Sequence, residues 1–287
     1  MSQQITPVKC TDLIKKYDFP VQKKYGQNFL TDSDVLESVV LAAQITKEDT
    51  VLEIGPGMGS LTACLLNAAK KVIAVEVDKM LIPILEEVLA GAENLVLIND
   101  DILKTDLESL IEKEAPGQKI KVAANLPYYI TTPVVMELLE NHSGIESITV
   151  MVQKEVAERM CTGPGSKAYG ALSLAVQYYA NPEIVFNVSK NSFVPRPDVD
   201  SAVIKLDIYE PDERPVKTDD PEKMFKVIRA AFNQRRKTLA NALSNAADLS
   251  YTKEDVSKAL KDMGLSESIR GEALSLFEFA RLADVLF

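Results

Sequence analysis

The stretch VLEIGPGMGSLT, residues 51–62, joins an apolar, strand-forming run to an amphipathic helical run through a glycine-rich turn. Its glycines, Gly55, Gly57 and Gly59, stand at alternate positions before the helix, where a missing side chain lets the backbone approach a ligand closely. A dinucleotide-binding loop would carry Gly or Ala where Ser60 stands, and a Walker-type loop would carry a lysine that is absent here. The stretch therefore predicts an α/β fold whose ligand is not held by phosphate, which disfavours an NAD-dependent dehydrogenase.

From residue 50 onward, short β-branched runs alternate with longer amphipathic runs such as 60–70 and 131–140. The strand-like runs cover residues 50–54, 72–76, 95–98, 120–124, 147–153, 183–189 and 201–209. Only a Pro-rich connection separates the last two, so we expect them to pair antiparallel at the end of the sheet. The pattern predicts a mostly parallel, Rossmann-like sheet of seven strands with a terminal antiparallel hairpin.

Composition divides the chain into three parts. Residues 1–30 read as an N-terminal arm, and the following TDSD predicts a helix capped by Thr31 or Asp32. Residues 31–209 hold the β-α repeats. After Tyr209 the polar linker EPDERPVKTDDPEK leads into helical runs with few β-branched residues, so residues 210–287 are expected to form a linker and a small α-helical domain.

Three acidic residues stand in register with the glycine loop. Glu53 lies within the first strand, and Glu76 ends the second strand 21 residues after Gly55, where a carboxylate can accept hydrogen bonds from two ribose hydroxyls. Asp100 or Asp101, of which the motif favours Asp101, can meet an adenine amino group. One such acid alone would read as a solvated strand end. Together with E-x-G-x-G-x-G, the set is typical of class I methyltransferases, which bind S-adenosylmethionine, a cofactor without phosphate.

The run after the fourth strand indicates the type of reaction. Residues 125–128, NLPY, have the form (N/D/S)-x-P-(Y/F/W) that is typical of methyltransferases acting on planar amino groups. The Asn125 side chain and the Leu126 carbonyl can accept both N–H groups of an adenine amine and direct its lone pair at a methyl group. Pro127 fixes the turn, and Tyr128 offers a face for stacking. Alone, the run would also fit a strand-ending turn with core aromatics.

These motifs give the chain a resemblance to the small-subunit ribosomal RNA adenine dimethyltransferases, the family linked to kasugamycin sensitivity. It rests on KKYGQNFL (23–30), EIGPGMGSLT (53–62), NLPYYITTP (125–133), MVQKEVAERM (151–160), FVPRPDVDSAV (193–203) and NQRRKTL (233–239). The resemblance implies a class I methyltransferase that dimethylates two adjacent adenosines near the 3′ end of 16S rRNA within the immature small subunit, with a role in its biogenesis.

The resemblance also assigns site residues. It implies that S-adenosylmethionine, leaving as S-adenosylhomocysteine, is bound by Gln27, Asn28, Leu30, Glu53, Gly55, Gly57, Gly59, Glu76, Asp101 and Asn125. Phe193 would close over the target base opposite Tyr128, although a hydrophobic anchor in the hairpin loop is its plainer role. No metal is implied.

Charge first argues against an RNA partner, because 32 basic against 42 acidic residues leave a net charge of -10. The acidic excess lies in residues 31–150, which carry 8 basic and 20 acidic side chains, whereas residues 223–247 contain no acid. We therefore expect RNA to be bound by Lys23, Lys24, Lys223, Lys226, Arg229, Arg235, Arg236 and Lys237. A solvated helix face is the alternative explanation of the basic run.

Other classes of function fit less well. Cys10, Cys64 and Cys161 contain no CxxC pair, and His142 is the single histidine, which disfavours a zinc module and triad hydrolysis. Without a signal-like or membrane-length apolar run, we expect a cytoplasmic, monomeric protein. The erythromycin-resistance methyltransferases of large-subunit rRNA are the nearest rival, and a DNA adenine methyltransferase would more usually have a second proline at Leu126. A ribosome assembly factor whose binding role dominates stays open.

Overall fold

The computed structural model describes residues 5–6, 9–22, 25–141, 144–218 and 220–286. The chain forms two compact units, Met1–Ala157 with Pro182–Ile208, and Glu158–Asn181 with Tyr209–Phe287. The second unit therefore includes the segment Glu158–Asn181, which the sequence alone places in the catalytic domain.

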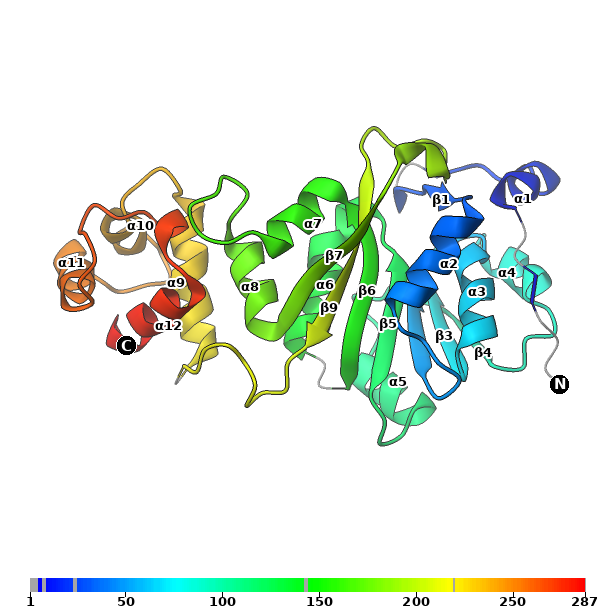
Figure 1. Ribbon diagram of the computed structural model, residues 1–287, viewed down its shortest axis with the longest axis horizontal. Helices are drawn as coiled ribbons and strands as arrows, with labels where there is room; N and C mark the ends of the chain where they lie inside the picture. Colours follow the sequence, from blue (N-terminus) through cyan, green and yellow to red (C-terminus); the bar gives the residue numbers. More distant parts are fainter. Residues whose placement is uncertain (1–4, 7–8, 23–24, 142–143, 219, 287) are drawn as a thin grey trace. The chain divides into compact units, whose positions relative to one another are not determined.

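The first unit is built on a seven-stranded sheet in the order β4-β3-β2-β5-β6-β9-β7 (Figure 1). The strands are β2 (Thr50–Ile54), β3 (Lys71–Glu76), β4 (Leu95–Asn99), β5 (Ile120–Asn125), β6 (Ile145–Gln153), β7 (Ala180–Val188) and β9 (Ser201–Ile208). The five strands β4, β3, β2, β5 and β6 are parallel to one another, and β9 runs antiparallel to β6. The predicted mostly parallel α/β fold is confirmed, and β7 lies beside β9 at the edge of the sheet.

Chain order places a topological switch beside β2. The chain passes from β2 outward to β3 and β4, then returns to β5 on the other side of β2 and continues to β6. Parallel strands that diverge in this way leave a crevice at their carboxyl ends, where loops can surround a ligand. The glycine loop follows β2, and the run NLPY begins at the last residue of β5.

Helices cover both faces of this sheet. Figure 1 shows α2 (Ser33–Ala42) and α3 (Ser60–Ala68) in front of the sheet and α6 (Thr131–Asn141) behind it. Of the two candidate caps, Asp32 caps α2, because its side chain accepts hydrogen bonds from the backbone N–H groups of Asp34 and Val35. The remaining helices of this part are α1 (Cys10–Lys16), α4 (Ile82–Val88), α5 (Leu107–Glu114) and α7 (Lys154–Cys161), which crosses into the second unit.

A second, two-stranded sheet ties the N-terminal arm to the loop between β7 and β9. Strand β1 (Phe29–Leu30) pairs antiparallel with β8 (Phe193–Val194), with Leu30 opposite Phe193. Phe29, Leu30 and Phe193 are at most 6% exposed and belong to the hydrophobic core of the first unit. The C-terminal end of the arm is thus folded onto the first unit.

The second unit is helical. It contains α8 (Ala171–Tyr179), α9 (Pro221–Asn233), α10 (Leu239–Ser244), α11 (Lys253–Asp262) and α12 (Leu276–Leu286). Apolar side chains from four of these helices form its core, including Ile228, Leu243, Leu260 and Phe279, all fully buried. In the described part of the chain, every helix is too short or too polar to span a bilayer.

Candidate active site

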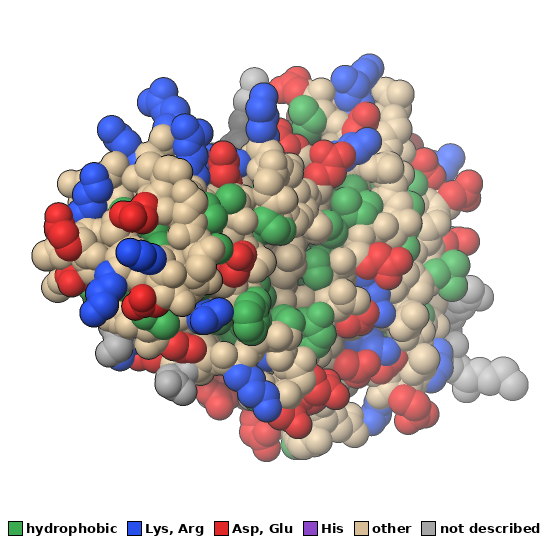
Figure 2. Space-filling view, turned by 60° about the vertical axis from the view of Figure 1, so that its left-hand side comes forward, with side chains coloured by type: hydrophobic (Ala, Val, Ile, Leu, Met, Phe, Trp, Pro, Cys, Tyr) green, Lys and Arg blue, Asp and Glu red, His purple; other side chains and the backbone are tan. Residues whose placement is uncertain are grey.

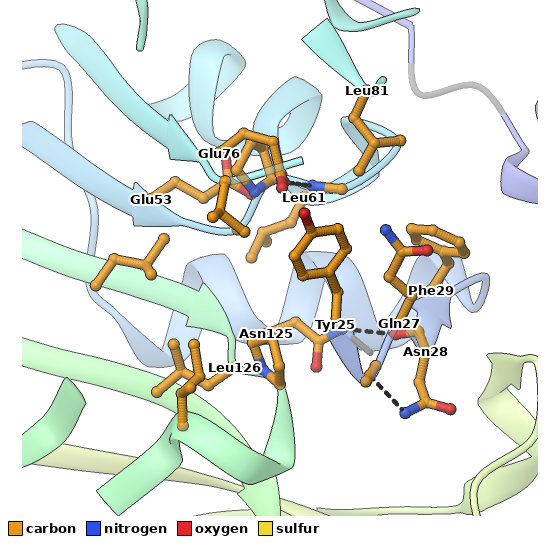
Figure 3. A pocket seen from close by; sticks show the side chains of 18 of the residues that line it. Tyr25, Gln27, Asn28, Phe29, Glu53, Leu61, Glu76, Leu81, Asn125 and Leu126 are labelled. Carbon is orange, nitrogen blue, oxygen red and sulfur yellow. Dashed lines mark hydrogen bonds between the residues drawn. The ribbon is translucent and has the colours of Figure 1, made fainter. Parts of the chain in front are cut away.

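A cavity of about 290 Å³ lies at the carboxyl ends of β2, β3, β4 and β5, within the first unit. This is near the lower end of the range of small-molecule sites, about 300–1,000 Å³. Among the predicted cofactor and catalytic residues, the cavity is lined by Gln27, Asn28, Leu30, Glu53, Gly55, Gly57, Glu76, Asp101, Asn125, Leu126, Pro127 and Tyr128. Segments that are far apart in the sequence therefore converge on one hollow, as Figure 3 shows.

The glycine loop borders this cavity with bare backbone. Gly55 has φ +68°, and a Cβ added to it would have no atom within 4 Å, so the missing side chain leaves open space. Gly59, also at positive φ, precedes the first residue of α3 instead of lining the cavity. The Gly57 N–H donates to Glu76 Oε2 at 3.1 Å, which joins the loop to the end of β3.

Two buried carboxyls face this loop. Glu53 is 1% exposed, and burial, with the nearby charge of Glu76 adding to it, raises its pKa to about 8. Its Oε2 has no hydrogen-bond partner among the described residues. Glu76 is 4% exposed; burial raises its pKa, while hydrogen bonds from the backbone of Asp78 and Gly57 oppose the shift. The site therefore holds acceptor groups whose charged forms are poorly solvated.

The third acidic position stays ambiguous. Asp100 and Asp101 both line the cavity. Asp101 Oδ1 accepts from the Leu103 N–H at 3.2 Å, and Oδ2 pairs with Lys104 at 3.1 Å. Asp100 Oδ1 accepts from the Asp101 N–H at 2.8 Å. Since both carboxylates have local partners, the preference for Asp101 stays a prediction.

The run NLPY has a fixed geometry. Asn125 Nδ2 donates to the Asn28 carbonyl at 3.1 Å, which leaves Oδ1 as the acceptor end of the amide. The Leu126 N–H donates to the Met151 carbonyl at 3.2 Å. The Tyr128 hydroxyl lies 2.8 Å from Ser201 Oγ, and burial raises its pKa. These contacts hold the two predicted amine acceptors and the predicted stacking ring at the cavity.

Two predicted residues are used differently from a simple ligand contact. Gln27 lines the cavity, but its side-chain amide donates to Asp78 and accepts from the Gln22 N–H. Phe193 is 2% exposed, paired with Leu30, and is not among the residues that line the cavity. Its predicted stacking role opposite Tyr128 remains a prediction, whereas the structure itself places the ring in the core.

Sequence reasoning missed much of the apolar lining. Tyr25, Met58, Leu61, Val77, Ile102, Leu103 and Tyr129 also line the cavity. Val77 and Leu103 are 42% and 40% exposed, so they present aliphatic surface at the cavity. An available signal was that Val77 directly follows Glu76 and that Ile102 and Leu103 follow Asp101, so each strand-end acid is succeeded by an apolar surface.

Comparison with known proteins then decides the family. The sequence profile described as ribosomal RNA adenine dimethylase matches residues 19–282. The chain belongs to this family. Ribosomal RNA small subunit methyltransferase A of Lachnoclostridium phytofermentans is 55% identical over 281 residues, covering 98% of this chain and 96% of that protein. The predicted resemblance is confirmed at the level of the family.

Solved structures agree with the adenine dimethylase fold. A dimethyladenosine transferase from Plasmodium falciparum superposes with a TM-score of 0.73 at 28% identity, covering 88% of this chain and 95% of that one. The 23S rRNA methyltransferase ErmE gives a TM-score of 0.68 at 26% identity, covering 90% and 99%. The fold is thus shared with methyltransferases named for different ribosomal RNAs.

The basic residues of this adenine dimethylase are not equivalent. Lys223 pairs with Asp220, and Lys226 with Glu222. Arg235 pairs with Glu272 at 2.8 Å and donates to the carbonyls of Ser166 and Lys167, so its guanidinium holds the second unit together. Arg229, Arg236 and Lys237 are exposed and have no ion-pair partner among the described residues. Lys23, Lys24 and His142 lie outside the described residues.

Figure 2 shows where charge gathers on one face of the molecule. Lys and Arg side chains cluster along the upper edge of the α-helical unit, while acidic side chains are frequent over the rest of that face. In the described ranges, no three His, Cys, Asp or Glu side chains come together in a group that could hold a metal ion.

Proposed function

We propose that this protein transfers methyl groups from S-adenosylmethionine to the exocyclic amino groups of two adjacent adenosines near the 3′ end of 16S rRNA, in the immature small subunit. The observation that carries the proposal is the convergence of the glycine loop, the strand-end acids and residues 125–128 on one cavity. Since one chain supplies all of these groups, we propose a monomer that acts in the cytoplasm, where its ribosomal substrate is assembled.

The residues at the cavity fit this cofactor. Gly55 leaves open space at the loop, and Glu53 Oε2 is a buried oxygen with no hydrogen-bond partner among the residues that the structure describes. Glu76 has both oxygens at the end of β3, where further hydrogen bonds from ribose hydroxyls can be accepted. Val77 and Leu103 supply exposed aliphatic surface for a purine ring. When bound, the cofactor supplies an electrophilic methyl group on sulfur.

The protein's part in the chemistry is to hold the amine. An adenine amino group is a weak nucleophile because its lone pair is delocalised into the ring. With Asn125 Nδ2 committed to the Asn28 carbonyl, Oδ1 is available to accept one N–H, and the Leu126 carbonyl can accept the other. Accepting both bonds would favour a pyramidal nitrogen with its lone pair directed at the electrophilic methyl group; on transfer the bond from that methyl to sulfur would break, S-adenosylhomocysteine would be left, and one amine proton would leave to solvent.

The small-subunit substrate is favoured over the large-subunit one by the strength of the two likenesses. Relatives named small subunit methyltransferase A reach 55% identity over nearly the whole chain, whereas ErmE, named for 23S rRNA, shares 26%. The long run FVPRPDVDSAV and the doubled tyrosines 128 and 129 also support the small-subunit branch.

We propose that the exposed basic residues of the second unit contact the RNA backbone. Arg229, Arg236 and Lys237 are exposed, whereas Arg235 is engaged within its own unit. When exposed Lys and Arg neutralise phosphates, the logarithm of the binding constant falls linearly with the logarithm of the salt concentration. RNA binding by an otherwise acidic protein should therefore be local and sensitive to salt.

The test is methyl transfer to defined particles. Purified protein and labelled S-adenosylmethionine are incubated with immature small subunits from a strain that lacks the enzyme, and in parallel with large subunits. We expect dimethylation of two adjacent adenosines in 16S rRNA only, mapped by mass spectrometry of nuclease fragments. Incorporation into 23S rRNA alone would favour the erythromycin-resistance type, and tight particle binding without incorporation would favour an assembly factor.

A further inference from the structure

We infer that Asp78 is a positioning residue for cofactor binding, because its carboxylate fastens the N-terminal arm beside the cavity. The inference rests on the proposed function, since it concerns the affinity for S-adenosylmethionine. Asp78 follows β3 by two residues and is 2% exposed, but it does not line the cavity itself. Any effect on the cofactor must therefore pass through the residues that it holds.

The carboxylate of Asp78 collects donors from the arm. Its Oδ2 accepts from Gln22 Nε2 at 3.0 Å and from Gln27 Nε2 at 2.8 Å. Its Oδ1 accepts from the Met80 N–H at 3.1 Å. Gln27 Oε1 in turn accepts from the Gln22 N–H at 2.8 Å. We call Gln22, Gln27 and Asp78 the Asp78 cluster; a buried carboxylate needs such donors to offset its lost hydration.

The same cluster is joined to the predicted ribose-binding group. The Asp78 N–H donates to Glu76 Oε1 at 2.8 Å, so the residue that holds the arm also orients a carboxylate in the cavity. Figure 3 shows Gln27 reaching from the arm on one side of the cavity and Glu76 on the other. A change in the side chain of Asp78 leaves this backbone bond intact, which allows the arm contact to be tested separately.

Further along, the arm is held at the NLPY run. The Asn28 carbonyl accepts from Asn125 Nδ2 at 3.1 Å. Gly26 packs closely against Tyr129, because a Cβ added there would lie 3.2 Å from the Tyr129 ring. Residues 26–30 therefore run between the Asp78 cluster and the run that would hold the target amine, and all five of them line the cavity.

Loss of the Asp78 contacts should weaken cofactor binding without blocking catalysis. If the arm is closed only part of the time, the apparent Kd rises in inverse proportion to the closed fraction. Saturating cofactor restores the closed arm, so kcat should be kept. A residue that merely supports the fold would instead change the amount of folded protein and leave the Kd of the folded fraction unchanged.

The first variant is Asp78→Asn, which keeps the volume and the Oδ1 acceptor. The new amide nitrogen would face the side-chain amide nitrogens of Gln22 and Gln27, which are donors as well. Rotating the Gln27 amide by 180° would present its oxygen to position 78, but it would break the hydrogen bond from the Gln22 N–H to Gln27 Oε1. We expect the Kd of S-adenosylmethionine and of S-adenosylhomocysteine, measured by calorimetry, to rise about tenfold, which equals about 1.4 kcal/mol. The KM for the cofactor should rise equally, with kcat within twofold. An unchanged Kd would overturn the inference.

The second variant exchanges the two partners. In Asp78→Asn combined with Gln27→Glu, the amide at position 78 can donate to the carboxylate at position 27, and that carboxylate can still accept from the Gln22 N–H. We expect the Kd to return to within about threefold of wild type, while Gln27→Glu alone, which brings two carboxylates together, binds more weakly. A double variant as weak as Asp78→Asn would show that Gln27 acts otherwise.

Two controls separate the possible failures. Asp106→Asn makes the same change of charge at the N-cap of α5, where Asn caps as well as Asp, and should leave the Kd unchanged. If Asp78→Asn does not fold, Gln22→Ala removes one donor from a residue outside the cavity and should raise the Kd about threefold, with no rise counting against the inference. Wild-type protein that binds neither ligand would refute the proposed function, whereas a normal wild type with an unaffected Asp78→Asn refutes only the role of Asp78.

Discussion

The buried carboxyl of Glu53 predicts an unusual dependence of stability on pH. Glu53 is 1% exposed, and burial together with the charge of Glu76 raises its pKa to about 8 from an ordinary value of 4.5. Glu53→Gln removes the titrating group and keeps the shape. As the pH rises from 4.5 to about 8, the free energy of unfolding of the wild type should therefore decrease by an amount that Glu53→Gln does not show.

The sign follows from proton binding. Between pH 4.5 and about 8, Glu53 is protonated in the folded chain and ionised in the unfolded chain. Unfolding then releases a proton, so the free energy of unfolding falls by about 1.4 kcal/mol per pH unit. The stabilisation is complete below pH 4.5, has decreased by about 3 kcal/mol at pH 7, and is fully lost above about pH 8.

The assay is urea unfolding of wild type and Glu53→Gln at intervals from pH 5 to 9. Any cost of imperfect hydrogen bonding by the amide is independent of pH, so it shifts the difference between the two pH profiles by a constant and does not alter how that difference changes with pH. We expect the difference between the profiles to change by about 3 kcal/mol between pH 5 and 8. Exposed Glu93, changed to Gln, should give a difference that stays within about 0.5 kcal/mol. Parallel profiles for wild type and Glu53→Gln would refute the reasoning.

The raised pKa of Glu53 also predicts how the affinity for the cofactor depends on pH. S-adenosylmethionine carries positive charge on its sulfonium and ammonium groups, so its binding should favour the ionised form of Glu53. Affinity in the wild type should then increase with pH up to about 8, the pKa of the free site, and level off above it. Glu53→Gln should bind more weakly at high pH and show a flatter profile. Equal affinities at every pH would mean that the cofactor does not use this carboxyl.

Three further predictions concern catalysis and RNA binding. Asn125→Ala should lower kcat at saturating cofactor about 100-fold or more, checked by single-turnover methylation; near-normal turnover would contradict its role as amine acceptor. Phe193→Leu should lower stability, because it shrinks a buried ring, and should raise the KM for RNA; normal kinetics in the folded variant would leave Phe193 as a core anchor. Arg236→Ala with Lys237→Ala should flatten the salt dependence of RNA affinity by about 1.4–1.8 in slope, whereas Arg235→Ala should mainly lower stability; a flattening of about 0.7–0.9 by Arg235→Ala would place that residue at the RNA as well.

Much of the fold follows from local pattern. The run predicted at 95–98 is β4, Leu95–Asn99, and the run at 147–153 lies within β6, Ile145–Gln153. Buried parallel strands have continuous β-branched composition, which marks them clearly. The start of β7 is less accurate: it begins at Ala180 instead of 183, because helix α8 passes directly into the strand without a turn.

The cavity could also be predicted in outline, since the carboxyl ends of parallel strands meet at one edge. That rule brings Glu76, Asp101 and Asn125 together from strands whose ends are identifiable in the sequence. The rule does not predict which partner a side chain binds when that partner is far away in the sequence. Gln27 contacts Asp78 across 51 residues, and no local pattern distinguishes that contact from one with a ligand.

The roles of the basic residues likewise depend on contacts that are distant in the sequence. Arg235 and Arg236 are neighbours with identical chemistry in the sequence. In the structure, Arg235 pairs with Glu272, 37 residues away, and donates to backbone carbonyls about twice as far, whereas Arg236 is exposed. Charge counting can locate a basic surface, but only packing determines which of its members can reach a phosphate.

The negative net charge and an RNA partner are then compatible for a physical reason. Glu53, Glu76 and Asp78 are acids of the catalytic unit that are at most 4% exposed, and Glu53, with a pKa of about 8, is mostly neutral at pH 7. The formal charge of -10 therefore overstates the repulsion that RNA meets. At physiological salt, exposed charges more than about 8 Å apart are largely screened. Affinity is consequently set by the sign of charge at the surface that meets the RNA, which we propose includes the exposed residues Arg236 and Lys237, and not by the total for the chain.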